Sequence, residues 1–65
     1  MNTLQVVQNV LAQCETLKRK NKRYYNLRGI KFSKTNINNL EKWLSEGCQF
    51  DLNQREKWLL AILMN

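Results

Sequence analysis

The chain contains no proline and only two glycines, Gly29 and Gly47, so few of its 65 residues can interrupt a helix. Proline breaks helices, and glycine commonly ends them just beyond the last helical turn. The two glycines therefore divide the chain into three stretches, each long enough for one helix. A chain of this length forms one domain, residues 1–65, with a small core. The sequence predicts an all-α fold: a small three-helix bundle with a long N-terminal helix and two shorter helices.

The first stretch has the apolar spacing of an amphipathic helix. Leu4, Val7 and Leu11 recur every three or four residues, which matches the period of a helix rather than the alternation of a strand. If the helix continues at 100° per residue, Tyr24 lies on the same apolar face, and the basic residues before it lie on the opposite face. We therefore predict one helix over about Thr3–Leu27, ended by the first glycine; a helix broken at Asn21 is the alternative that the sequence leaves open.

The two later stretches have recognisable helix starts. Residues 30–34 are expected to be a connector, and either Ser33 or Thr35 caps the second helix. Asp51 is one candidate cap for the third helix. Asn53, with Glu56 three residues later, is the other candidate because the pair matches a capping box.

The third helix is predicted to be apolar on all sides. One face can pack on the other helices, but so short a chain cannot cover the remaining faces, and an uncovered apolar patch usually marks a partner surface. We expect a homodimer or another protein to cover it; the alternative is a frayed, partly exposed terminus. A repeated Glu-Lys-Trp-Leu places Trp43 and Trp58 at equivalent helix positions, and we expect both in the core. The predicted interface residues are Trp58, Leu59, Leu60, Ile62, Leu63 and Met64.

Positive charge is concentrated in residues 18–34, hereafter the basic segment. This segment holds eight of the 11 Lys and Arg residues and none of the five acidic ones, and the formal net charge of the chain is +6. Such clustering is typical of a surface for a polyanion or an acidic protein, although a solvated helix face is the plainer interpretation. The candidate binding residues are Lys18, Arg19, Lys20, Lys22, Arg23, Arg28, Lys31 and Lys34.

Nucleic-acid binding is the first functional hypothesis. The basic segment would contact phosphates of DNA or RNA, and Tyr24, Tyr25 or Phe32 could stack on unpaired bases unless these aromatics belong to the core. Asn26 and Asn36 could reach base edges, but the sequence singles out neither. The residues around Gly47 do not fit the apolar and small positions of a helix-turn-helix.

The alternative hypothesis is a small modulator or inhibitor of phage or plasmid type that binds a larger protein. Its basic face would dock on an acidic or nucleic-acid-binding surface of a host enzyme or of the ribosome, with Trp58 in the hydrophobic anchor. Cys48 with Leu52-Asn53-Gln54-Arg55 and then Trp58-Leu59 is similar to a short stretch of ribosome modulation factor. The resemblance implies ribosomal RNA as one possible polyanion and transfers no site residue.

Catalysis, cofactors and metals are not expected. The chain has no histidine, its acidic residues are separated in sequence, and neither Cys14 nor Cys48 has a histidine to activate it. The two cysteines, without a Cys-x-x-Cys motif, predict free thiols in a cytoplasmic protein rather than a zinc site or a disulfide framework. No signal peptide or run of about 20 apolar residues is found, so no membrane association is expected.

Overall fold

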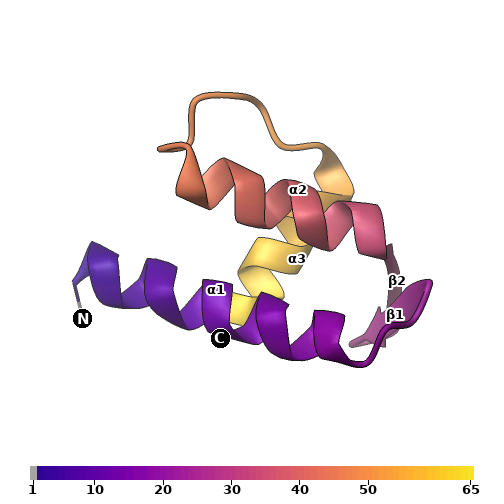
Figure 1. Ribbon diagram of the computed structural model, residues 1–65. Helices are drawn as coiled ribbons and strands as arrows, with labels where there is room; N and C mark the ends of the chain where they lie inside the picture. Colours follow the sequence, from indigo (N-terminus) through magenta and orange to yellow (C-terminus); the bar gives the residue numbers. More distant parts are fainter. Residues whose placement is uncertain (1) are drawn as a thin grey trace.

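The computed structural model describes residues 2–65 and contains three helices and a small sheet (Figure 1). In chain order the elements are α1 (Thr3–Arg19), β1 (Tyr24–Leu27), β2 (Ile30–Ser33), α2 (Lys34–Ser45) and α3 (Gln54–Met64). The prediction of three helices is confirmed. The sheet makes the fold mostly helical rather than purely all-α.

The first helix ends eight residues before the predicted end at Leu27, and Asn21 is the reason. Asn21 has a φ of 52°, in the left-handed region. Asparagine tolerates this conformation better than most residues and is a recognised alternative to glycine just beyond a helix end. Its backbone N–H donates to the carbonyl of Lys18 at 3.0 Å, which satisfies one of the last carbonyls of α1. The prediction of a single helix over Thr3–Leu27 is therefore wrong.

The strands β1 and β2 form an antiparallel hairpin closed by Arg28 and Gly29. Leu27 pairs with Ile30, and the two residues between them have φ values of 51° and 80°. Positive φ at both central positions defines the turn type that best matches the twist of two paired strands. Residues 30–33, predicted as part of a connector, are thus a strand, and Gly29 serves this turn rather than a helix end.

Capping side chains fix the starts of α2 and α3. Ser33 caps α2: its Oγ accepts from the N–H of Asn36 at 3.2 Å, and Asn36 Oδ1 accepts from the N–H of Ser33 at 2.9 Å. Asn53 and Glu56 make the equivalent reciprocal pair at α3, at 2.8 and 3.2 Å. The alternatives Ser33 and Asn53 are therefore the actual caps. As predicted, α2 ends just before Gly47, whose φ is 78°.

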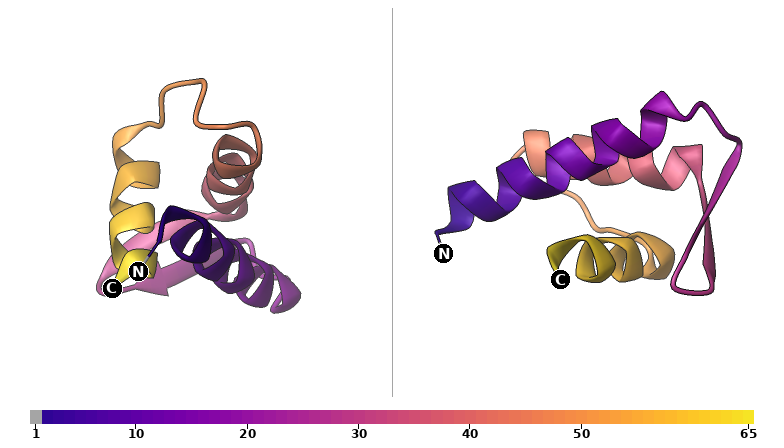
Figure 2. Two further views of the ribbon diagram at one scale, coloured as in Figure 1. Left: turned by 90° about the vertical axis from the view of Figure 1, so that its left-hand side faces the viewer. Right: turned by 90° about the horizontal axis from the view of Figure 1, so that it is seen from below.

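The helices α1 and α2 lie side by side and antiparallel, and the hairpin joins them at one end (Figure 1). The helix α3 lies across one face of the pair formed by α1 and α2, as the two views of Figure 2 show. The core lies between the three helices and the inner face of the hairpin. None of the described helices is long and apolar enough to cross a membrane. The buried apolar residues are Val10, Cys14, Tyr25, Phe32, Ile37, Leu40, Leu52, Leu59 and Leu63.

The two free cysteines differ sharply in their surroundings. Cys14 is buried in the core, and Cys48 is exposed after α2. Burial, reinforced by the nearby Glu41 carboxylate and partly opposed by Lys18, raises the pKa of the Cys14 thiol from 9.0 to about 12. Since the thiolate is the reactive form, Cys14 is protected by both burial and protonation.

We expect one thiol of the native protein, that of Cys48, to react with an aromatic disulfide reagent at pH 8, and Cys14 to react only after unfolding. Because the folded-state pKa of Cys14 is raised, its contribution to stability is present below pH 9 and is lost as the pH rises towards 12. Thiol titration with and without guanidinium, on wild type and Cys48→Ser, checks this. Rapid modification of native Cys48→Ser would contradict it.

Candidate nucleic-acid interface

The basic segment spans the end of α1, the hairpin and the first residue of α2. The prediction that Arg19, Lys20, Lys22 and Arg23 share one face of a continuous helix is therefore wrong, because α1 ends at Arg19. Two of the cations of the segment are neutralised by carboxylates. Lys18 Nζ lies 2.6 Å from Glu41 Oε1, which joins α1 to α2, and Arg19 Nη2 lies 3.2 Å from Glu15 Oε1 one turn earlier. The hydrogen bond to Glu41 raises the pKa of Lys18. Lys18 therefore stabilises the packing of α1 on α2 and is less available to bind a ligand.

The base of the hairpin is fastened to both flanking helices. Lys34 is half-buried, and its Nζ donates to Asn21 Oδ1 at 2.8 Å. Its backbone N–H donates to the carbonyl of Arg23 at 3.2 Å, and the N–H of Lys22 donates to the hydroxyl of Tyr25 at 3.1 Å. These contacts hold the hairpin against the ends of α1 and α2.

The remaining five cations of the segment are exposed and surround the hairpin. None of them makes an ion pair with a carboxylate among residues 2–65. Lys20 and Lys22 line a hollow beside the free edge of β1. Arg23 and Arg28 come directly before and after β1 in sequence, and Lys31 projects from β2. We refer to them together as the hairpin cations: Lys20, Lys22, Arg23, Arg28 and Lys31.

The three aromatic candidates divide between the two faces of the hairpin. Tyr25 and Phe32 form a cross-strand pair on the inner face, with exposed fractions of 4% and 0%, so they belong to the core and cannot stack on bases. Tyr24 is 49% exposed on the outer face. The ammonium of Lys31 lies 4.1 Å from the centroid of the Tyr24 ring, a cation–π contact that keeps this charge on the outer face.

Arg55 of α3 is a cation of this region that the sequence did not indicate. Its guanidinium donates to the backbone carbonyl of Lys31, on the edge of β2 away from β1. The two residues help to line a polar hollow of about 410 Å³ where α2 and α3 begin. The contact joins residues 24 positions apart, so no local pattern could reveal it.

The buried polar residues near this hollow are fully engaged with one another. Glu56 is 3% exposed, and its carboxylate accepts hydrogen bonds from the side chains of Asn36, Asn39 and Asn53 at 3.4, 3.0 and 3.1 Å. Asn36, one of two asparagines considered as base contacts, is thus committed to this network. Asn26, the other, is exposed on β1.

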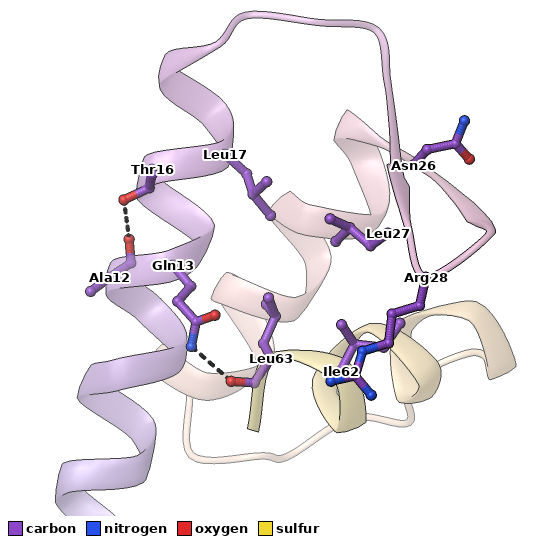
Figure 3. Close-up of a pocket in the computed structure, with 9 residues that line it drawn as sticks. All are labelled: Ala12, Gln13, Thr16, Leu17, Asn26, Leu27, Arg28, Ile62 and Leu63. Carbon is purple, nitrogen blue, oxygen red and sulfur yellow. Dashed lines mark hydrogen bonds between the residues drawn. The ribbon is translucent and has the colours of Figure 1, made fainter. Parts of the chain in front are cut away.

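A second surface feature is an open, mostly apolar groove of about 500 Å³ between α1, the hairpin turn and the end of α3 (Figure 3). Leu17, Leu27 and Ile62 point towards it, and Arg28 also lines it. Gln13 Nε2 donates to the carbonyl of Leu63 at 2.7 Å and so ties α1 to the last turn of α3. We refer to this feature as the apolar groove.

The predicted interface residues of α3 are only partly available. Leu59 and Leu63 are core residues, whereas Leu60 and Ile62 are half-buried. Trp58 and Met64 are 43% and 53% exposed. The expectation that both tryptophans lie in the core is wrong for Trp58, since only Trp43 packs against it.

No protein-family model, curated protein or solved structure matches this chain. Its function is therefore inferred only from the residues of this chain and from their arrangement. Within residues 2–65 no group of three or more metal-binding side chains comes together. The described surface offers unpaired cations, one exposed tyrosine and an apolar groove.

Proposed function

We propose that this protein binds nucleic acid through the phosphate backbone, with the hairpin cations as its principal contacts. The observation that carries the proposal is that these five charges remain exposed and unpaired around one small element. Mutual repulsion between them costs stability unless a polyanion neutralises them. Each phosphate contact also releases condensed counterions, which favours binding at low salt.

The salt dependence of binding tests this proposal directly. With about five phosphate contacts, the logarithm of the association constant should fall against the logarithm of salt concentration with a slope of about −4.5 on duplex DNA and about −3.5 on single strands. The measurement is fluorescence anisotropy with labelled duplex and single-stranded oligonucleotides of random sequence between 50 and 200 mM salt. A slope near zero, or no binding at 50 mM salt, would refute the proposal.

Paired charge reversals locate the interaction. Arg23→Glu with Lys31→Glu should weaken binding at 50 mM salt by at least about 100-fold, because two attractive contacts become repulsive. Lys42→Glu with Lys57→Glu is the matched control for charge, because it reverses two cations that are exposed on α2 and α3, outside the hairpin. An equal loss from this control would show that net charge alone drives the binding.

Arg28 permits a variant that weakens binding without damaging the fold. A non-glycine residue with a φ of 51° is strained, and asparagine accepts this conformation more readily than arginine. Arg28→Asn should therefore leave the protein as stable or slightly more stable, while it removes one hairpin cation. A several-fold loss of affinity with an unchanged melting temperature is the expected result. Unchanged affinity would remove Arg28 from the interface.

A second candidate function is docking on a larger protein, and the apolar groove favours it. Ile62 lines the groove, and the exposed Trp58 lies one turn before it on the same side of α3. The hairpin cations nearby would suit an acidic rim on the partner, whereas their repulsion opposes a homodimer. This mode predicts a nuclease-resistant complex with a cytoplasmic protein that Trp58→Ala abolishes and Lys42→Glu retains. Light scattering that gives the mass of a dimer would assign the surface to a second copy instead.

A further inference from the structure

The outer face of the hairpin presents a small, ordered set of polar side chains. Residues of β1 and β2 alternate, so that Tyr25 and Phe32 point into the core while Tyr24, Asn26 and Lys31 are exposed. Asn26 helps to line the rim of the apolar groove, and Figure 3 shows its side chain directed to the opposite side of β1 from Leu27. The outer face is therefore free of core packing.

Asn26 and Lys31 are directly opposite each other on this face, at the end nearer the turn. The strand register pairs them, and the contact with the Tyr24 ring holds the Lys31 ammonium close to the face. An asparagine amide can donate to and accept from an adenine, and a lysine ammonium can donate to the two acceptors of a guanine. This pair thus carries the two chemistries needed to distinguish base pairs.

Cations lie on both flanks of the ribbon. Lys20 and Lys22 line a hollow with Leu17 of α1 and with residues 24–27 of β1, but with no residue of β2, so they flank the free edge of β1. Arg55 donates to the carbonyl of Lys31 and so flanks the free edge of β2. If the outer face entered a groove of a nucleic acid, a sugar–phosphate backbone would lie on each side of the hairpin. The flanking cations could contact the phosphates of both backbones.

The dimensions of nucleic acids select one kind of groove. Paired strands are about 4.8 Å apart, and a two-stranded ribbon with its side chains fits the major groove of B-form DNA, which is about 12 Å wide. The minor groove, at about 6 Å, is too narrow, and the major groove of A-form RNA is deep and narrow. The helix α3 is a poorer candidate because it begins with a near balance of acidic and basic residues.

We propose that the hairpin enters the major groove of duplex DNA with its outer face towards the bases, so that Asn26 and Lys31 contact base edges. Lys31 then contacts a base edge rather than a phosphate, and Arg55 takes its place among the phosphate contacts. Lys20 and Lys22 on one flank and Arg55 on the other contact the two phosphate walls. This inference rests on the proposed function, to which it adds the class of nucleic acid and the residues that give sequence preference. The apolar inner face remains in the core throughout.

The test begins with selection of preferred sites from a random duplex library by the full-length wild-type chain. On the selected duplex, Asn26→Ala and Lys31→Ala should each weaken binding by about 5- to 150-fold, which is the discrimination that one good base contact provides. On a scrambled duplex Asn26→Ala should have almost no effect, since it removes no charge. Arg55→Gln should weaken binding to both duplexes by the same factor, because a phosphate contact carries no sequence information. Both exposed positions 26 and 31 tolerate alanine without loss of the core.

Methylation interference identifies the groove independently of any variant. Methyl groups at guanine N7, in the major groove, should block binding to the selected duplex, whereas methyl groups at adenine N3, in the minor groove, should not. Interference only at adenine N3, equal affinity for double-stranded RNA, or uniform loss from Asn26→Ala on both duplexes would overturn the inference. With any of these results, a steep salt dependence of binding would still support the proposed function. If binding showed no salt dependence, both the proposed function and this inference would be refuted.

Discussion

Phe32→Ala is expected to unfold a large fraction of the protein. Phe32 is fully buried on the inner face of β2, within the core formed by the hairpin and the helices. Loss of a buried phenylalanine costs about 3–5 kcal/mol through lost burial and the cavity left behind. At about 0.05–0.15 kcal/mol per residue, a chain of 65 residues has a total stability of only about 3–10 kcal/mol.

The measurement is the free energy of unfolding from urea titration followed by far-ultraviolet circular dichroism. Tyr24→Ala is the matched control because it removes an aromatic ring from the same hairpin but from the exposed face. It should cost about 1 kcal/mol or less, the value of an exposed cation–π contact. Equal losses from the two variants would mean that the hairpin does not pack on the helices as the structure shows.

Glu56→Ala is expected to cost about 2–4 kcal/mol of stability, an unusually large effect for the removal of one carboxylate. Three asparagine side chains and the backbone N–H of Asn53 donate to this buried group. Without it, the amide of Asn36 is buried and lacks that acceptor, and the start of α3 loses half of its capping box. The same urea titration measures the loss.

Glu46→Ala is the control for this second prediction because it makes the same change in net charge at an exposed position. Its effect should lie within about 0.5 kcal/mol of zero. Glu56→Gln should fall between the two, since its amide oxygen still accepts while its NH₂ group faces other donors. A loss from Glu56→Ala no larger than that from Glu46→Ala would show that the asparagine network contributes little.

The helical part of the fold could be predicted because its signals are local. The apolar spacing of α1, the glycine after α2 and the Asn53–Glu56 capping box each act within about one turn, and the structure retains all three. The hairpin was missed for a definite reason: Gly29 fits both a helix end and a tight turn. The signal that favours the turn is the spacing of apolar residues on either side of Gly29. Tyr25 and Leu27 are two positions apart, as are Ile30 and Phe32, which is the period of a strand.

The candidate interface could be predicted only as a range of residues. Sequence shows that residues 18–34 are basic, but the burial of Phe32, the pairing of Lys18 with Glu41 and the arrival of Arg55 beside Lys31 all depend on tertiary packing. Likewise, the apolar run of α3 did not reveal that Leu59 and Leu63 face the core while Trp58 faces outward. Such distinctions require the positions of the neighbouring helices.

The contacts of Lys34 with Asn21 and Arg23 have a thermodynamic implication for any ligand of the hairpin. A loop that becomes ordered on binding loses conformational entropy at that moment, and its affinity falls accordingly. Here the ribbon is already fixed to α1 and α2 in the free protein. Association should therefore proceed close to rigid-body docking, with an on-rate set by charge attraction rather than by the folding of a flexible arm.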